Sequence, residues 1–289
     1  LKWSLSHCML PTVIKLNSNK IRIFYGSRNI KNISSIGFVD ISYKKKKFEV
    51  IKYSKKPILA PGLLGSFDDN GVLPSCIIKK KKLFYLFYIG WRPSVTTRYS
   101  LIAGLAISKD LNRFKRLSRS PILNLHNEEP YQILTAPTVI RKNREYYMWY
   151  VSCNKWKNKD LPFYDIKFAK SKNLKDWDQT GISCIKLKRG ERAVARPFVM
   201  YEKNVFKMWY CYEKKTKGYK IGYGESLDGM RHGRGQLSYA NGDKYFGEFE
   251  RDLFHGFGTF QWAPYDDEVT GMSIAGKRYE GDYQDGKRH

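Results

Sequence analysis

The sequence lacks the features that mark membrane-spanning and disulfide-rich proteins. Its 289 residues include only five cysteines, an odd number with no C-x-x-C pair, so neither a disulfide framework nor a zinc site is indicated. No apolar run approaches the length of a transmembrane helix. The first residues also lack the apolar stretch of a signal peptide, so we expect a cytoplasmic protein. The start at Leu1 suggests a fragment, which leaves a lost leader as the alternative.

Acidic residues are scarce in most of the chain. Residues 1–227 contain 45 Lys and Arg against 16 Asp and Glu, a net charge of +29, whereas residues 228–289 contain 8 against 11, a net charge of −3. Such a basic field can attract nucleic acid. The lysine runs stand at turns and lack interleaved aromatic residues, however, so we interpret them as solvated loops and expect no specific nucleic-acid partner.

Aromatic residues are abundant, at 15% of the chain, and they recur with a period near sixty. Four aromatic-rich segments each end in a tyrosine, with spacings of 63, 62 and 60 residues; these closing tyrosines are Tyr25, Tyr88, Tyr150 and Tyr210. A proline precedes each segment, with spacings of 63, 63 and 60 residues; these prolines are Pro11, Pro74, Pro137 and Pro197. Short strands of this composition predict antiparallel sheet, and a repeat of this length suits a β-propeller blade. We therefore expect an all-β propeller with four recognisable blades over residues 1–227.

A shorter, glycine-rich repeat follows over residues 228–289. The segment 228–235 (DGMRHGRG) is echoed by 252–258 (DLFHGFG), and a third copy begins at Asp285. This pattern closely resembles the MORN repeat, which implies a β-hairpin array and possible self-association through residues 228–289. The recurring His232, His255 and His289 are read as turn residues of the repeat rather than a metal ladder, and no metal or cofactor is expected.

The first piece resembles the five-bladed propellers of the glycoside hydrolase clan that contains families 32 and 43. The stretches that carry the resemblance are 65–74 (GSFDDNGVLP), 88–91 (YIGW), 126–131 (HNEEPY) and 191–197 (ERAVARP). Residues 1–62 fit more loosely as the first blade. Because that clan closes its ring with five blades, four blades followed by hairpins predict an incomplete propeller or a fusion.

The resemblance implies catalytic carboxylates on the innermost strands, near the prolines. The family's Asp-Pro and Glu-x-Pro signatures are absent here, so the candidates stand slightly earlier in the sequence. Glycoside hydrolysis requires an acid and a base or nucleophile. Asp69 is the candidate base or nucleophile, with a simple Asp-Asp-Asn-Gly turn as the equal alternative. Glu129 and Glu191 compete for the acid role, and either could instead be an ordinary loop glutamate.

Six further residues are candidates for substrate binding. They are Asp68, Arg196, Trp91, Trp156, His7 and Arg28. Arg196 could clamp a carboxylate or phosphate, or form an ion pair with Glu191. Trp91 and Trp156 are expected in loops where they could stack on a sugar ring, whereas Trp149, Trp209 and the closing tyrosines are expected in the core.

Two functions remain open from the sequence. The leading hypothesis is a glycoside-active propeller, hydrolase-like or phosphorylase-like, that acts on a bacterial polysaccharide or oligosaccharide. The alternative is a non-catalytic carbohydrate-binding or scaffold protein whose hairpins mediate association. The missing acidic signatures favour the alternative.

Overall fold

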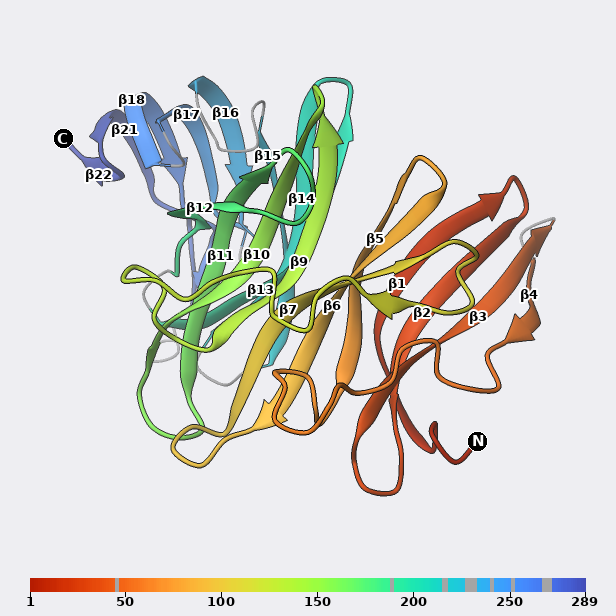
Figure 1. Cartoon of the computed structure of the whole chain (residues 1–289). Helices are drawn as coiled ribbons and strands as arrows, with labels where there is room; N and C mark the ends of the chain where they lie inside the picture. Colours follow the sequence, from red (N-terminus) through yellow and green to blue (C-terminus); the bar gives the residue numbers. More distant parts are fainter. Residues whose placement is uncertain are drawn as a thin grey trace. The chain divides into compact units, whose positions relative to one another are not determined.

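Every regular element in the described part of the chain is a β-strand (Figure 1). The structure is a computed structural model that describes residues 1–44, 47–187, 190–214, 218–226, 233–239, 242–250, 253–266 and 272–289. Within these ranges there is no helix that could cross a bilayer. The chain packs as two compact units, residues 1–163 with 169–180 and residues 164–168 with 181–289. Strands β11 (Pro162–Ser171) and β12 (Asp178–Ile185) contribute residues to both units.

The first sheet of the first unit is a four-stranded antiparallel meander. Its strands are β1 (Ser6–Asn17), β2 (Lys20–Arg28), β3 (Ser34–Lys44) and β4 (Lys47–Tyr53). One face buries Phe24 and Phe38 together with the Arg22–Asp40 ion pair, whose Nε–Oδ1 distance is 2.6 Å. The guanidinium of Arg22 also lies 3.6 Å from the centre of the Phe38 ring. On this face, therefore, Arg22 both pairs with Asp40 and packs on the buried Phe38 ring.

The next two repeats continue the same pattern in the first unit. Their strands there are β5 (Val72–Lys80), β6 (Leu83–Pro93), β7 (Tyr99–Ser108), β8 (Lys115–Arg116), β9 (Ile133–Lys142) and β10 (Glu145–Trp156). Hairpins link β5 to β6 and β9 to β10, and a short parallel pairing at Leu101 and Ile133 links β7 to β9. Buried apolar clusters lie between successive sheets, as a propeller requires.

A bulge marks the innermost strand of each repeat. The pairing register shifts at or beside the recurring proline in β1, β5 and β9, and again in β13 (Glu191–Glu202) of the second unit. In three repeats the residue before the proline has a positive φ: Leu10 at 55°, Ala136 at 48° and Arg196 at 52°. This conformation is costly for residues with a Cβ, and a following proline disfavours the right-handed helical alternative. The bulge is thus a repeated feature of the fold.

The second and third repeats have the same type of turn after their third strand. Ser108 Oγ accepts a hydrogen bond of 2.9 Å from the Leu111 N–H, and Ser171 Oγ accepts one of 2.9 Å from the Leu174 N–H. Both leucines have positive φ and are buried. A serine side chain that satisfies the backbone allows each strand to end in the same compact turn.

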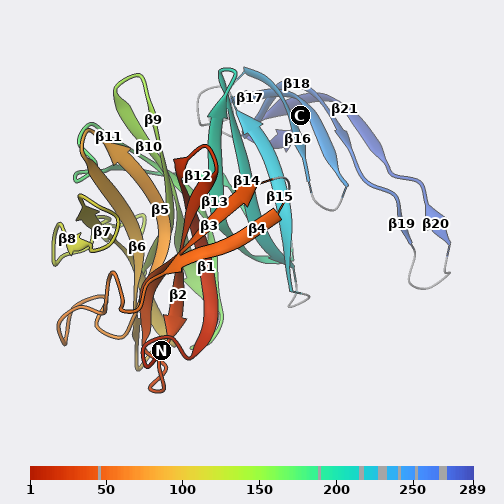
Figure 2. The ribbon, with the colours of Figure 1, turned by 90° about the vertical axis from the view of Figure 1, so that its right-hand side faces the viewer.

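The second unit contains the hairpin array and part of a larger sheet, in which β13 also pairs in parallel with β11 at Ala193 and Tyr164. The sheet pairs β13, β14 (Val205–Lys214) and β15 (Tyr219–Ser226). The array consists of β16 (Gly233–Ser238), β17 (Lys244–Glu250), β18 (Leu253–Gln261), β21 (Arg278–Gln284) and β22 (Lys287–Arg288), which Figure 2 shows in part, with the small side hairpin β19 (Tyr265–Asp266) and β20 (Ser273–Ile274).

Glycines explain the close packing of the hairpin array. Gly247, Gly258 and Gly281 face one another across β17, β18 and β21. The ring of Tyr245 lies against two of these glycines, since an added Cβ would come within 2.5 Å of the tyrosine oxygen at Gly247 and within 2.3 Å at Gly258. Tyr245 in turn stacks on Phe254 with a centroid distance of 3.8 Å. The absent side chains therefore make room for the aromatic core.

The expected all-β propeller followed by a hairpin array is confirmed. The proposed boundary at 227/228 and the first glycine-rich motif, including His232, fall largely on residues 227–232, which lie outside the described residues. His255 and His289 lie in the array. The short hairpin of β19 and β20 lies between β18 and β21 in the sequence.

Candidate functional site

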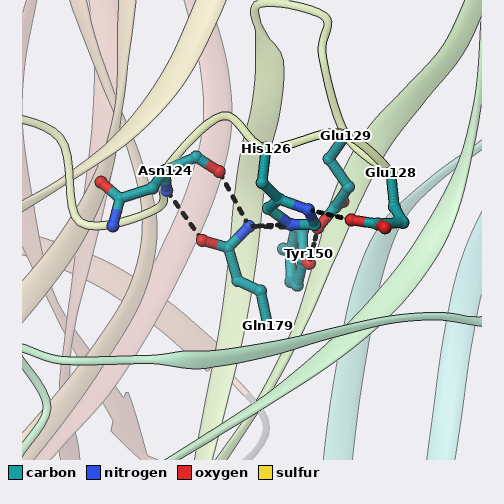
Figure 3. A network of polar contacts seen from close by, with 6 residues as sticks. All are labelled: Asn124, His126, Glu128, Glu129, Tyr150 and Gln179. Atoms are coloured by element: carbon teal, nitrogen blue, oxygen red, sulfur yellow. Dashed lines mark hydrogen bonds and ion pairs between the residues drawn. The ribbon is translucent and has the colours of Figure 1, made fainter.

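A polar network in the first unit surrounds Glu129, whose side chain is fully buried at 0% exposure (Figure 3). Its Oε2 accepts hydrogen bonds from the Tyr150 hydroxyl at 2.6 Å and from Gln179 Nε2 at 3.1 Å. His126 Nε2 lies 2.9 Å from the same oxygen. Three polar groups thus converge on one carboxylate oxygen, a geometry that suits an ionised acid acting as acceptor.

The network reaches solvent through His126 and Glu128. His126 Nδ1 lies 2.8 Å from Glu128 Oε2, so a carboxylate oxygen stands at each ring nitrogen. Glu128 is exposed, whereas His126 is partly covered. The imidazolium form would donate to both acids at once. Figure 3 shows the imidazole held between the two carboxylates.

Gln179 links the network to the backbone of Asn124 through two hydrogen bonds. Its Oε1 accepts a hydrogen bond of 2.7 Å from the Asn124 N–H, and its Nε2 donates to the Asn124 carbonyl at 3.1 Å. Because Gln179 comes from β12 and Asn124 from the loop before β9, this double contact holds the loop against the outer strand. The position of His126, two residues further on, is fixed as a result.

The preceding repeat contains a matching network around Asp68, which is 1% exposed. Asp68 Oδ2 accepts from the Tyr88 hydroxyl at 3.0 Å and from Arg116 Nε at 2.8 Å. Burial, and then the nearby Asp68 carboxylate, raises the pKa of Tyr88, so its hydroxyl remains a donor. Arg116 also donates to the Ala60 carbonyl at 2.6 Å.

The two networks share one plan. In each, a buried acid before the innermost strand accepts from the closing tyrosine of its own repeat and from a residue of the outer strand. The acid and tyrosine are 20 residues apart in one network and 21 in the other, and the acid and outer-strand residue are 48 and 50 apart. Asp68 and Glu129 therefore anchor equivalent loops.

Asp69, the predicted base or nucleophile, stands beside this anchor but is partly exposed. Its Oδ2 accepts a hydrogen bond of 2.8 Å from the Gly65 N–H, and its own N–H donates to the Ser66 carbonyl at 3.3 Å. These bonds belong to a turn, the alternative that the sequence left open. The turn also holds the carboxylate in place at the start of β5.

His7 and Arg28 lie together at one end of the first sheet. Ser6, next to His7, is opposite Arg28 in the β1–β2 pairing. His7 is exposed, has a φ of 65°, and its Nδ1 lies 2.9 Å from Ser6 Oγ. Arg28 donates to Asn32 Oδ1 at 2.8 Å. The strand pairing thus places both residues at the same end of the first sheet.

The two candidate stacking tryptophans are both in strands rather than loops. Trp91 is in β6, partly exposed, and its backbone N–H donates to the Gly71 carbonyl at 2.9 Å. Trp156 ends β10 and packs edge-to-face on Tyr99 with a centroid distance of 5.8 Å. Aromatic β-propensity explains the placement, because the strands extend further than the polar sequence around them suggested.

The second unit holds the remaining predicted residues. Glu191 and Arg196 are both in β13 and partly exposed, with Glu191 opposite Lys214. Burial, and then Glu191 and Asp243, raises the pKa of Tyr212. The adjacent Arg192 forms an ion pair with Glu213 and donates to the Tyr219 hydroxyl at 3.3 Å. Glu191 therefore lies in a strand end that is rich in polar contacts.

Several residues of the networks were not predicted from the sequence to belong to a site. These are Tyr88, Arg116, His126, Tyr150 and Gln179. The tyrosines were expected as core and are buried, but their hydroxyls serve the acids. The signal was present, because an acid precedes Tyr88 by 20 residues and Tyr150 by 21. No cluster of His, Cys, Asp and Glu suited to a metal ion is found in the described ranges.

Comparison with known proteins separates the two parts of the chain. Residues 223–244, 245–266 and 279–289 match the MORN repeat family. The chain is 32% identical over 234 residues to the uncharacterized protein Rv1502 of Mycobacterium tuberculosis, covering 80% of this chain and 76% of the relative. It is also 29% identical over 134 residues to a 1,2-beta-oligomannan phosphorylase of a Thermoanaerobacter species, covering 45% and 44% of the two chains.

Solved structures with a similar fold are glycoside hydrolases. A glycoside hydrolase aligns with a TM-score of 0.60 at 16% identity, covering 96% of this chain and 90% of that chain. A thermostable family-43 glycoside hydrolase gives 0.57 at 15%, with the same coverage. The family-32 beta-fructofuranosidase of Bombyx mori gives 0.59 at 13%, covering 95% and 64%. The chain therefore belongs to the family of Rv1502, shares the β-propeller fold of these glycoside hydrolases, and carries MORN repeats in its C-terminal part.

Proposed function

We propose that the chain acts on the glycosidic bonds of an oligosaccharide or a bacterial polysaccharide, and that it transfers the glycosyl group to water or to phosphate. The bond between the anomeric carbon and the leaving oxygen breaks, the leaving oxygen takes a proton from a carboxylic acid, and water or phosphate forms the new bond. The likeness to an oligomannan phosphorylase supports phosphate as one acceptor.

The observation that carries this proposal is the different exposure of neighbouring acids. Asp68 and Glu129 are sealed in hydrogen-bonded networks, whereas Asp69 and Glu191 are partly exposed at the start of innermost strands. A catalytic carboxylate must reach the sugar, and its position must be fixed. In this proposal Asp69 is the candidate base or nucleophile of the first unit, and Glu191 is tested separately as a candidate acid of the second unit.

The buried Glu129 is then the second candidate for the acid, and it acts first of all through its neighbours. It holds His126 where the imidazole and Glu128 face solvent. Of the predicted binding residues in the first unit, His7 and Arg28 supply polar groups for hydroxyls or phosphate, Trp91 and Trp156 supply ring faces, and Asp68 positions Asp69. Arg196 is the polar candidate of the second unit.

The test is an assay of the purified full chain on a panel of oligosaccharides that includes β-1,2-linked oligomannosides. Each reaction is run with and without inorganic phosphate, and both free sugar and sugar 1-phosphate are measured. We expect turnover of at least one substrate, with the 1-phosphate formed only if phosphate is the acceptor. Binding of a glycan without turnover would instead support the carbohydrate-binding alternative.

Paired variants then test the roles of the acids. Asp69→Asn and Glu191→Gln should each lower kcat/KM by roughly 10²–10⁴-fold, the usual contribution of general acid–base groups. Asp160→Asn, at an exposed ion pair with Arg98, and Glu145→Gln, at the far end of β10, are the matched controls and should retain the parent rate. Parent-like rates in both active-site variants would refute the assignment.

A further inference from the structure

One position of the repeat changes its environment only in the last copy. The residue before each closing tyrosine is aromatic: Phe24, Phe87, Trp149 and Trp209. The first three are 0%, 0% and 1% exposed. Trp209 was expected in the core as well, but it is only half-buried. In the fourth repeat, therefore, the aromatic side chain at this position is less buried than in the other three repeats.

The first unit shows what covers this position. Phe24 lies in one buried cluster with Tyr88, the closing tyrosine of the following repeat. Phe87 lies in the next cluster with Tyr150, again the closing tyrosine of the following repeat. Each sheet therefore offers a forward face, which carries the penultimate aromatic residue, to a backward face, which carries the closing tyrosine.

In the described part of the second unit, the last propeller-type strands carry a partly exposed forward face. We call it the Trp209 face, and its residues are Phe198, Met200, Trp209, Ile221 and Tyr223. They share one side of β13–β15 by strand alternation and pairing register. Phe198, Met200 and Ile221 are exposed, and the Trp209 ring contacts Phe198 and Tyr223 at centroid distances of 6.1 and 4.9 Å. An apolar, aromatic surface of this kind marks an interaction site.

The described strands of the first unit begin with a partly exposed backward face. We call it the Tyr25 face, and its residues are Val13, Ile23, Tyr25, Val39 and Tyr53. Val13, Ile23, Val39 and Tyr53 are adjacent across the four strands of the first sheet. Trp3 stacks on Tyr25 at a centroid distance of 6.2 Å, but Val13 and Tyr53 stay exposed.

We propose that the Trp209 face of one copy packs on the Tyr25 face of a second copy. The contact would repeat, between molecules, the pairing that joins Phe24 to Tyr88 and Phe87 to Tyr150 within the first unit. The side of the Trp209 face carries Glu202 and Glu225 together with Lys207, whose Nζ lies 3.0 Å from Glu202 Oε2. The side of the Tyr25 face carries Lys15, so Glu225 is the acid that can face a cation of the second copy. The interface is head-to-tail, and it is independent of the proposed catalytic function.

The experiment measures the mass of the full chain in solution by sedimentation and light scattering over a range of concentrations. We expect the parent to associate as its concentration rises. Ile221→Lys places a cation opposite Lys15, and Val13→Glu places an anion opposite the glutamates, so each variant alone should be monomeric. Ile30→Lys and Val95→Glu make the same changes at exposed positions outside both faces and should associate like the parent.

Mixing the two interface variants gives the decisive result. Each still has one intact face, and the two intact faces are complementary, so an equimolar mixture should form a 1:1 dimer that grows no further. A monomeric parent would overturn the proposal. So would association that Ile221→Lys abolishes and Val13→Glu leaves unchanged, because that pattern belongs to two Trp209 faces packed on each other. Circular dichroism melting of every variant confirms that each remains folded.

Discussion

The hydroxyl of Tyr150 donates a hydrogen bond of 2.6 Å to the buried carboxylate of Glu129, 21 residues earlier in the sequence. Tyr88 does the same for Asp68 at 3.0 Å across 20 residues. Each bond ties the loop that leads into an innermost strand to the middle strand of the same repeat. The closing tyrosine thus has two functions, since its ring fills a core cluster and its hydroxyl satisfies a buried acid.

Removal of that hydroxyl should destabilise the first unit. Tyr150→Phe and Tyr88→Phe each take a donor from a buried carboxylate, which should lower the free energy of unfolding by about 1–3 kcal/mol. Tyr85→Phe is the control, because Tyr85 is half-buried in the same strand as Tyr88 and takes no part in either network. Urea unfolding measures all three, and equal midpoints would show that the tyrosine–acid bonds contribute nothing.

The bulge in the innermost strand predicts that a glycine substitution there costs little stability. Ala136 has a φ of 48°, so Ala136→Gly relieves about 1 kcal/mol of backbone strain and offsets the loss of its buried methyl group. Ala169 is also buried in a strand but is not among the positive-φ residues, so Ala169→Gly should cost about 1 kcal/mol or more. Thermal unfolding compares the two variants. A larger loss for Ala136→Gly would contradict the strained bulge.

Asp110 predicts a dependence of stability on pH. Hydrogen bonds, first that from the Asn112 backbone N–H, lower the pKa of Asp110 to about 2 from 3.8. The ionised form is therefore favoured by folding, and this contribution is complete above pH 3.8 and lost as the pH falls through about 2. Because the carboxylate is exposed, solvent screening keeps the effect below about 1 kcal/mol.

The comparison of the parent with Asp110→Asn isolates that contribution. The amide keeps an oxygen acceptor for the turn but carries no charge. The parent should exceed the variant in urea midpoint at pH 5, and the difference should shrink steadily as the pH is lowered. A difference that grows at acid pH would have the wrong sign for a depressed carboxyl pKa.

The hairpin array should be sensitive to one added methyl group. Gly258→Ala would bring a Cβ to 2.3 Å from the Tyr245 oxygen, so the ring must move and about 1–3 kcal/mol of stability should be lost. Thr259→Ala changes the next residue, which faces the other side of the strand, and serves as the control. Limited proteolysis followed by mass analysis would locate the destabilised region. Equal protection of the two variants would mean that the glycine row does not pack as described.

The periodic features of the fold could be predicted from the sequence because they depend on local patterns. Alternating aromatic strands and recurring prolines indicated repeated antiparallel sheets, and the glycine motifs indicated hairpins. The hydrogen-bonded networks around Asp68 and Glu129 were harder to predict from the sequence. Asp68 and Glu129 were noticed as acids near inner strands, but their tyrosine partners lie about twenty residues away and their outer-strand partners about fifty away. Only the three-dimensional path of the repeat brings these groups together.

Burial was the property that the sequence could least determine at the site. Asp68 and Asp69 are consecutive and chemically identical, yet one is sealed by Tyr88 and Arg116 while the other is partly exposed in a turn. Strand alternation explains Trp209 in a similar way. Its strand position is the one used for core in earlier repeats, but in the described part of its unit the next sheet is the hairpin array rather than a further propeller repeat.

The excursion between β18 and β21 is closed at its base. The Trp262 N–H donates to the Lys277 carbonyl at 2.8 Å, directly beyond the paired residues Gln261 and Arg278. Because this bond completes the ladder before the chain departs, the length of the departing segment does not affect the alignment of the two long strands. The array therefore has a place where peptides of different length and sequence can be inserted, such as an epitope or a tether, while the glycine row stays in register.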